Sequence, residues 1–483
     1  MKIINLKLIL YTTSLVLLFE GAFMTLAILA SIIYDAGSII SIFQSTIITI
    51  AIGGILFFLT RKGLDKEPSI KEGFLIVTLG WIILSLFGTL PYILSGSIKS
   101  FSDAFFESAS GFTTTGSSIL TDIESIPKGI LFWRSETHWI GGMGIIMLVL
   151  AIFPFFKYGG VYLFGAEFSN LLFTKLKPKL IDTAKRLWFV YILLTVIEII
   201  LLYAGKMELF DSICHAFGTI ATGGFSTRNA SIADYSPYIQ YVIMVFMTLS
   251  GISFASHYFL LKGNYEKVIN NQELKFFITI IVITGLSISV YLFNHGYPYE
   301  KAFRSSFFQV ISIITCTGFS TADYQEWPKY AGAIIFALMF VGGCSGSTSG
   351  GIKAVRHLIL VKRVFLNIKS KLHPTMIKEV HFNDNTLDDN ITSNIISYVL
   401  IYLFTFCLGT IIMSCFNLPL SSAASSIATT MGGIGPGFGI IGPSGNFAAI
   451  PNPGKYVLSV FMILGRLEIL PVIVLITKRF WQI

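Results

Sequence analysis

Charged side chains are scarce in this chain. Asp, Glu, Lys and Arg account for 12% of its 483 residues, whereas they account for about 25% of an average soluble domain. Hydrophobic residues reach 54% and aromatic residues 14%, and the mean hydropathy is +0.75. This composition excludes an ordinary soluble globular protein and indicates a protein that lies in a membrane.

Cysteine frameworks and catalytic patterns are also missing. The five cysteines are odd in number and include no Cys-x-x-Cys pair, so we expect neither a disulfide framework nor a metal site. No Ser-His-Asp, His-Glu-x-x-His or paired-carboxylate constellation falls within one predicted compartment. A membrane-embedded enzyme is therefore an alternative without a set of catalytic residues, and we expect no enzymatic activity.

Long apolar segments are frequent, and many have about 20 residues, the length that crosses the hydrocarbon core of a bilayer. Residues 1–30 lack a small-residue cleavage site followed by a polar domain, so we interpret them as a retained helix and not as a signal peptide. The sequence predicts a hairpin of two spans at 8–34 and 39–60. A unit of one span, one short segment and one returning span then occurs four times, which gives ten crossing helices in total. The first spans of the units are expected at 73–94, 187–203, 276–293 and 394–413, and the returning spans at 130–156, 238–261, 331–364 and 456–477.

Basic residues gather in alternate connections between these spans, and this placement accounts for the net charge of +8. The basic connections are at 61–71, 157–186, 262–275, 353–378 and 478–479. The positive-inside rule places them in the cytoplasm, so both termini are expected there. Anionic lipid headgroups are one explanation of such a basic face, and no nucleic acid partner is expected.

Four runs rich in glycine and threonine interrupt the apolar sequence, one at the end of each short segment. They read ASGFTTTGSS (109–118), ATGGFST (221–227), TCTGFST (315–321) and TMGGIGPG (430–437). Such clusters usually mark loops. Thirteen residues before Gly116, Gly224, Gly318 and Gly435, however, stand Asp103, Asp211, Ser305 and Ser422. All four are residue types that cap helix N-termini, so the register predicts four short re-entrant helices, each followed by one run.

Four copies of one unit can surround an axis, as identical subunits do. The C-terminal ends of four short helices would then point toward the membrane midplane, where their negative dipole ends favour a cation. Glycines permit the left-handed or extended backbone that turns carbonyls inward, and rings of carbonyls replace the hydration shell of a potassium ion. The four runs are therefore predicted to form a selectivity filter.

Several motifs together resemble the TrkH/TrkG and KtrB superfamily of potassium transporters. GFST follows the second and third predicted filter segments, and IGPG occupies 434–437. HWIGGMGI at 138–145, GRLE at 465–468 and the extra hairpin are more similar to the TrkH branch. The resemblance implies an all-α polytopic membrane protein with four tandem M1–P-loop–M2 potassium-channel-like repeats in pseudo-fourfold symmetry around a central pore, preceded by a two-helix hairpin. The implied division of the chain is 1–68 for the hairpin and 69–160, 161–265, 266–380 and 381–483 for the repeats.

The same resemblance assigns sixteen residues to the filter, which would bind potassium through their carbonyl oxygens. They are Thr113, Thr114, Thr115 and Gly116; Ala221, Thr222, Gly223 and Gly224; Thr315, Cys316, Thr317 and Gly318; and Gly432, Gly433, Ile434 and Gly435. In plant HKT relatives, a serine in place of the first filter glycine accompanies sodium transport. Gly116 at that position favours potassium here.

The third returning span is interrupted by GGCSGSTSGG at 342–351. The run does not match the GxxxxGK[ST] pattern of a phosphate cradle. A simple kink is one interpretation, because Gly and Ser pairs bend helices. The resemblance implies instead an intramembrane loop that gates the pore below the filter. The implied gate residues of the loop are Gly342, Gly343, Ser345, Gly346, Ser347, Gly350 and Gly351.

Arg466 lies near the middle of the fourth returning span. An arginine at that depth costs about 2.5 to 3.5 kcal/mol to insert, so it is not expected to face lipid. One interpretation is a structural pair with Glu468 or another carboxylate. The resemblance implies that its guanidinium projects into the pore, where it would repel cations and contact the loop at 342–351.

Two histidine-centred interpretations carry less weight. His138, Arg134 and Glu136 could form a proton relay, but polar residues are ordinary near the outer start of a helix. His215 falls inside the second short helix, where packing is expected and ligation is not.

The expected function is therefore potassium transport across the cytoplasmic (inner) membrane by a gated, channel-like subunit. The alternative is a proton- or sodium-coupled potassium symporter, which would need a titratable residue near the midplane; only Glu468 was a candidate. The resemblance implies a homodimer and a cytoplasmic TrkA-like regulatory subunit that binds nucleotide. Potassium is the transported ion, and no nucleotide is expected on this chain itself.

Overall fold

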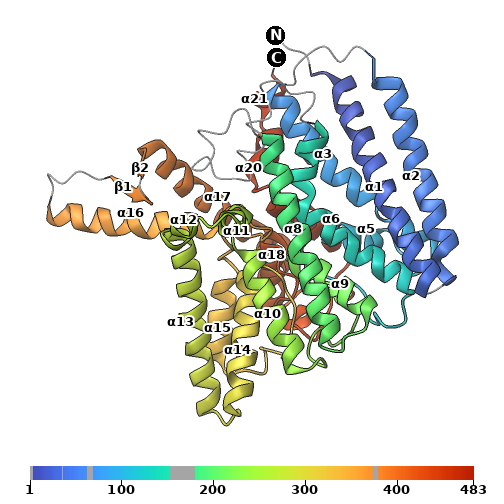
Figure 1. The fold of residues 1–483 in the computed structure, drawn as a ribbon. Helices are drawn as coiled ribbons and strands as arrows, with labels where there is room; N and C mark the ends of the chain where they lie inside the picture. Colours follow the sequence, from blue (N-terminus) through green and yellow to red (C-terminus); the bar gives the residue numbers. More distant parts are fainter. Residues whose placement is uncertain are drawn as a thin grey trace.

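The computed structural model describes residues 4–34, 36–62, 69–152, 180–373, 379–383 and 385–482. Almost all regular structure in these ranges is helical (Figure 1). The strands found there are β1 (Val380–Phe382) and β2 (Asn385–Leu387), which pair antiparallel as a hairpin. Several basic residues of the predicted connections, namely Lys66, Lys157, Lys175, Lys177, Lys179 and Lys378, lie outside the described residues.

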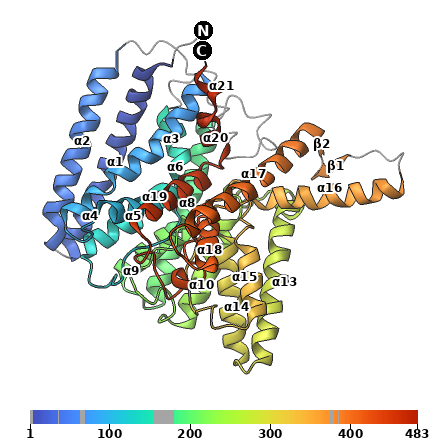
Figure 2. The same cartoon turned by 180° about the vertical axis from the view of Figure 1, so that it is seen from behind.

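The predicted N-terminal hairpin is confirmed. It consists of α1 (Leu6–Tyr34) and α2 (Ile39–Thr60), joined through the short helix η1 (Ala36–Ser38). The two helices lie side by side in both views (Figures 1 and 2). A Cβ on Gly21 of α1 would lie 2.5 Å from Cγ1 of Ile50 on α2, so a glycine permits this close packing. Large apolar side chains on the outer face of α2 remain exposed, as a lipid-facing helix requires.

Four helical units follow the hairpin in the predicted order. The first contains α3 (Ile70–Phe87), α4 (Leu90–Leu94), α5 (Phe101–Phe112) and α6 (Lys128–Ile152). The second contains α8 (Leu180–Ala204), α9 (Leu209–Ile220), α10 (Pro237–Gly251) and α11 (Phe254–Leu261), followed by α12 (Tyr265–Ile269). The third contains α13 (Gln272–Asn294), α14 (Tyr299–Ile314), α15 (Lys329–Leu338) and α16 (Ala354–Leu372). The fourth contains α17 (Asp389–Ser414), α18 (Leu420–Gly432), η4 (Gly439–Ile441), α19 (Asn452–Arg466), α20 (Leu470–Ile476) and α21 (Lys478–Trp481).

The first span of every unit is long and apolar enough to cross a membrane. Together with the hairpin these make six such segments among the described residues. The returning spans are less regular. The second bends by 100° between α10 and α11, and the fourth bends by 118° between α19 and α20, so up to eight spans result if each bent pair counts as one. The expected ten crossing helices are therefore not all single straight helices.

The third returning segment is not one helix. After α15 ends at Leu338, the chain runs through an irregular stretch that includes 342–351 and resumes as α16 at Ala354. Both views show α16 extending sideways from the bundle toward the β1–β2 hairpin (Figures 1 and 2). The predicted end of the first returning span, at residue 156, lies outside the described residues.

The short helices begin earlier than the sequence register indicated. Their N-caps are Ser100, Glu208, Pro298 and Pro419. The four predicted caps were therefore wrong. Asp103, Asp211 and Ser422 each lie in the first turn of their helix, whereas Ser305 lies a full turn further inside α14. A carboxylate in the first turn is still stabilised by the positive end of the helix dipole.

The start of the chain and its end meet at one end of the molecule (Figure 1). The backbone N–H of Asn5 donates to Glu72 Oε1 at the start of α3, over 2.7 Å. Lys71 Nζ donates to the carbonyl of Phe480 in α21, also over a short distance of 2.6 Å. These bonds place the beginnings of α1 and α3 and the end of α21 on the same face.

Candidate ion-conducting site

The four segments that follow α5, α9, α14 and α18 share one unusual backbone conformation. In each, a residue with positive φ precedes a glycine with positive φ by two positions. The first residues are Thr114 (φ 55°), Thr222 (55°), Cys316 (59°) and Gly433 (67°), and the glycines are Gly116 (76°), Gly224 (78°), Gly318 (81°) and Gly435 (96°). Positive φ is uncommon outside glycine. Its recurrence at the same place in four segments gives Gly435 the same position in the fourth segment as Gly116 has in the first.

The four segments form a closed ring. A Cβ on Gly116 would lie 2.1 Å from the carbonyl oxygen of Gly223. A Cβ on Gly224 would lie 1.9 Å from that of Thr317, and one on Gly318 would lie 1.8 Å from that of Ile434. Gly435 returns to the first segment, where the carbonyl oxygen of Thr115 is 3.0 Å away. Each glycine is therefore required because the backbone of the next segment occupies the space of a side chain.

Seven carbonyl oxygens of this ring accept no hydrogen bond from the described part of the chain. They belong to Thr114, Thr115, Thr222, Cys316, Thr317, Gly433 and Ile434. All of these residues are buried except Gly433. Buried carbonyls normally have a partner. A cation or ordered water in the ring would supply it.

The threonine hydroxyls of the ring have other partners. Thr113 Oγ1 donates to the carbonyl of Ala109 in α5 over 2.6 Å, and it lies 2.8 Å from Thr115 Oγ1. Thr315 and Thr317 repeat the second contact at 2.8 Å. In the first and third segments the threonine side chains thus brace the segment on its own helix.

A cavity of about 170 Å³ opens on one side of the ring, and all four positive-φ glycines line it. Residues from the stretches after the filter segments form most of its wall, including Ser117, Ser226 and Ser320.

The loop at 342–351 lies against the other side of the ring. A Cβ on Gly350 would lie 2.2 Å from the carbonyl oxygen of Gly432 at the end of α18. Thr348 Oγ1 donates to the carbonyl of Ile220 at the end of α9 over 3.0 Å. A Cβ on Gly351 would lie 3.5 Å from Cys316 Sγ. The loop therefore touches three of the four segments, and its glycines allow that approach.

Two side chains that the sequence interpretation missed hold this loop. Buried Glu273, in the first turn of α13, accepts from the N–H of Ser345 (2.6 Å) and from that of Val355 (3.1 Å) through one oxygen. Lys353 Nζ donates to the carbonyls of Ser349 and Ser347. Glu273 stands out in the sequence, because it is an acidic residue at the start of an otherwise apolar span. Its bonding partners could not be predicted from the spacing of residues.

Arg466 ends α19 and joins the loop to α6. Its Nη1 donates to the carbonyl of Thr348 (2.9 Å), and its Nη2 donates to that of Gly141 (2.7 Å). Glu468, the carboxylate considered as its partner, is paired with Arg356 instead. The structure thus brings Arg466 and the loop together.

The proposed relay residues have separate partners. Arg134 pairs with Glu107, and His138 Nδ1 lies 2.8 Å from the carbonyl oxygen of Gly111. His215 bonds to the main-chain oxygen of Asp211 (2.7 Å) and to Ser226 Oγ (2.9 Å), so it is a structural residue. No group of three or more His, Cys, Asp or Glu side chains suited to a metal occurs among the residues that the structure describes.

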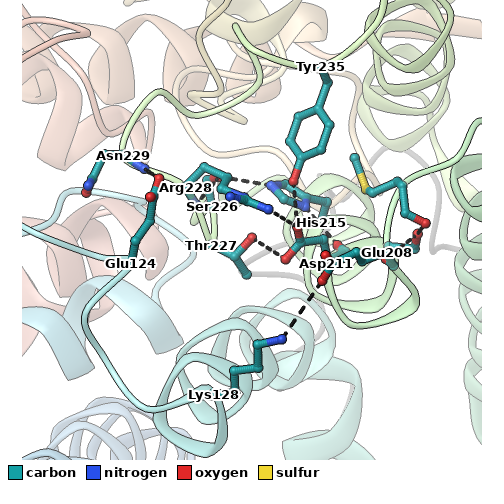
Figure 3. Close-up of polar contacts among 12 residues, drawn as sticks. Glu124, Lys128, Glu208, Asp211, His215, Ser226, Thr227, Arg228, Asn229 and Tyr235 are labelled. Carbon is teal, nitrogen blue, oxygen red and sulfur yellow. Dashed lines mark hydrogen bonds and ion pairs between the residues drawn. The ribbon is translucent and has the colours of Figure 1, made fainter. Parts of the chain in front are cut away.

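A polar network secures the start of α9 (Figure 3). The carboxylate of Asp211 accepts from Thr227 Oγ1 (2.7 Å), Tyr235 OH (2.8 Å) and Arg228 Nη2 (3.4 Å). Burial alone would raise the pKa of this carboxyl, but the hydrogen bonds from Thr227 and Tyr235 outweigh burial, so its pKa lies below the ordinary value of 3.8. Thr227 closely follows the second filter segment. The network therefore attaches the stretch after this segment to the first turn of α9.

Asp211→Asn should lower the thermal unfolding temperature of the purified protein. Hydrogen bonds to a charged group contribute roughly 1.5 to 3 kcal/mol each, and the variant loses the charge. The folded-state pKa is depressed, so the stabilisation is complete above the ordinary pKa of 3.8 and is lost as the pH falls through the folded value. The gap between wild type and variant should therefore close below about pH 3.8. Asp234→Asn is the control, because Asp234 is exposed and lies beside Tyr235 in the stretch before α10. An equal effect of the two variants would contradict the prediction.

Known proteins match this chain over nearly its full length. The sequence model of the TrkH family, described as a cation transport protein, matches residues 38–483. The Trk system potassium uptake protein TrkH of Escherichia coli (strain K12) is 37% identical over 477 residues, which cover 97% of each chain. TrkG of the same organism is 32% identical over 457 residues, or 94% of each chain. The crystal structure of the potassium transporter TrkH from Vibrio parahaemolyticus matches with a TM-score of 0.88 and 31% identity, and the match covers 99% of this chain and 100% of that one.

Proposed function

Because this chain belongs to the TrkH family of cation transport proteins, we propose that it conducts potassium ions as the membrane subunit of a Trk-type uptake system. Its relatives are named as potassium uptake proteins, so the activity is transport and not enzymatic catalysis. The apolar spans and the family together identify an integral protein of the cell membrane. Potassium is the ion that it transports, and the lipid bilayer surrounds its apolar spans.

One observation carries the proposal: the closed ring of four glycines with seven carbonyl oxygens that accept no hydrogen bond from the described chain. Rings of this kind replace the hydration shell of potassium. The filter residues of this proposal are the sixteen that the resemblance named. The repeats at 69–160, 161–265, 266–380 and 381–483 would each supply one quarter.

Reconstitution of the purified chain in liposomes tests this function. A potassium flux that reverses at the potassium equilibrium potential, independent of pH and sodium, is the expected result. A flux that reverses elsewhere when the pH or sodium gradient changes would favour the coupled symporter. That alternative has less support, because Glu468, the candidate named from the sequence, is paired with Arg356. Glu20, Glu136 and Glu198 are also buried in the described spans, and the same experiment tests them.

The gate is proposed to consist of the loop at 342–351 and Arg466. Contacts of the loop with Gly432, Ile220 and the side chain of Cys316 support a position directly under the filter. In this arrangement the loop blocks the ion path, and opening requires it to move away. Arg466 holds the loop in place and adds positive charge below the filter.

Glu273→Ala should free this loop. The carboxylate accepts from the N–H of Ser345 inside the loop and from that of Val355, which follows the loop. Loss of two charge-assisted bonds, each worth roughly 1.5 to 3 kcal/mol, should speed hydrogen exchange of the 342–351 amides at least about tenfold. Basal potassium flux should rise with it.

Glu266→Ala, which removes an exposed carboxylate on the neighbouring α12, is the matched control for Glu273→Ala. Unchanged exchange and unchanged flux in the Glu273 variant would contradict the prediction.

Orientation and partners are part of the proposal. The shared position of the two chain ends and the basic residues near them supports cytoplasmic termini. A homodimer and a cytoplasmic TrkA-like nucleotide-binding subunit are proposed from the family, and α16 with its basic last turn is a suitable cytoplasmic element. Labelled nucleotide should bind to the complex and not to this chain alone.

A further inference from the structure

In the first three repeats, one position of the short helix bonds to the stretch that follows the filter segment. Nine residues before each filter glycine stand Glu107, His215, Gln309 and Ser426. Glu107 accepts from Ser118 Oγ (2.8 Å) and from the N–H of Ile119 (2.9 Å). The other braces follow the same rule: His215 bonds to Ser226 Oγ at 2.9 Å, and Gln309 Nε2 donates to the carbonyl of Ala322 at 3.2 Å. In the fourth repeat Ser426 bonds within its helix, and its neighbour Ser425 accepts from the N–H of Phe438 at 2.9 Å.

At this position only the first repeat has a carboxylate, and that carboxylate pairs with a buried arginine. Glu107 is 0% exposed and Arg134 is 2% exposed, and Arg134 Nε lies 2.7 Å from Glu107 Oε1. Burying two charges is expensive, and a pair of well-packed apolar residues usually stabilises a fold as well. Such a pair is best explained by the geometry that it fixes.

Arg134 extends this brace into the second repeat. Its Nη1 donates to the carbonyl of Ser226 over 2.9 Å. Its guanidinium also lies over the ring of Phe225, 3.6 Å from the centroid. Phe225 and Ser226 directly follow the filter glycine Gly224. The planar guanidinium therefore makes three directional contacts, which link α5, the helix before the first filter segment, to the two residues that follow the second filter segment.

We propose that the Glu107–Arg134 pair is a positioning element of the filter, which sets the spacing of the first two segments and thereby the preference for potassium over sodium. The proposal rests on the ion-conducting function proposed above. A positive charge alone is not enough for this role, because lysine has no planar group that could contact Glu107, Ser226 and Phe225 together.

Two variants test the pair by the ratio of potassium to sodium flux in liposomes. Glu107→Gln removes the negative charge but keeps the shape of the side chain. Arg134→Lys keeps the positive charge but removes the planar guanidinium group. Both should lower the ratio at least roughly tenfold, because breaking one partner of a buried hydrogen-bonded charge pair has effects of that size or larger. Glu300→Gln is the matched control, since Glu300 also lies 2.7 Å from an arginine, Arg304, but is exposed. An unchanged ratio in Arg134→Lys would overturn the geometric role.

The double variant Glu107→Gln/Arg134→Gln separates positioning from folding, because it leaves no unpaired buried charge. A near-normal unfolding temperature with a lowered ratio supports the proposal, and a normal ratio overturns it. Gly116→Ser is measured in the same assay, because it distinguishes a failure of the positioning role from a failure of the proposed function. If Gly116→Ser lowers the ratio and the pair variants do not, the positioning role fails and the filter stands. If Gly116→Ser has no effect either, the proposed function itself fails.

Discussion

Gly116→Ser should abolish most of the discrimination between potassium and sodium. The ring leaves no room for the new side chain, because a Cβ at this position would lie 2.1 Å from the carbonyl oxygen of Gly223. The residue also has a φ of 76°, which costs a non-glycine residue about 1 to 3 kcal/mol. The first and second segments must therefore separate. We expect the potassium-to-sodium flux ratio in liposomes to fall by roughly tenfold or more, equal to about 1.4 kcal/mol of lost discrimination per tenfold step.

The chain offers a control that separates backbone strain from crowding. Gly296 has a φ of 90°, and a Cβ there would meet nothing within 4 Å. Gly296→Ser imposes the same kind of strain outside the ring, so its flux ratio should equal that of the wild type. An unchanged ratio in Gly116→Ser, with normal expression, would refute the filter assignment.

The ring could be predicted from the sequence to a large extent because its cause is local. A glycine is needed wherever the next segment touches the backbone, so the four glycines repeat at a fixed distance from their helices. That register named Gly435 in the fourth run, and Gly435 has a positive φ like the other three. The same counting failed at the helix starts. Where a helix begins depends on the preceding turn and on residues such as Pro298 and Pro419, not on the filter.

Contacts between distant parts of the chain could not be predicted in this way. The bonds of Glu273 to the loop, of Arg466 to Thr348 and of Arg134 to Ser226 join residues that no periodicity relates. Glu468 illustrates the limit. Its closeness to Arg466 in sequence suggested a pair, but the chain bends by 118° just after Arg466, and Glu468 meets Arg356 on α16. The bend itself has φ of 53° at Glu468 and 62° at Ile469, values that side chains of these types rarely adopt and that no composition rule predicts.

Arg466→Ala should raise potassium flux through the reconstituted protein. In the structure its guanidinium holds the loop through Thr348 (2.9 Å) and α6 through Gly141 (2.7 Å). Its charge also opposes a cation below the filter: two unit charges about 8 Å apart interact by roughly 2 kcal/mol at an effective dielectric constant of about 20. Removing both effects should increase the flux at least about tenfold. Lys262→Ala, which removes an exposed positive charge elsewhere, should leave the flux unchanged.

Arg466→Lys then separates the two effects. Lysine keeps the charge, but its single ammonium group cannot reproduce the forked bonding to Thr348 and Gly141. If electrostatic repulsion is the barrier, the lysine variant should conduct like the wild type. If the anchoring of the loop is the barrier, it should conduct nearly as well as the alanine variant, and hydrogen exchange of the 342–351 amides should be faster in both. A flux in Arg466→Ala that is unchanged or lower at normal expression would contradict either form of the gate, because both require this side chain to hold the pore closed.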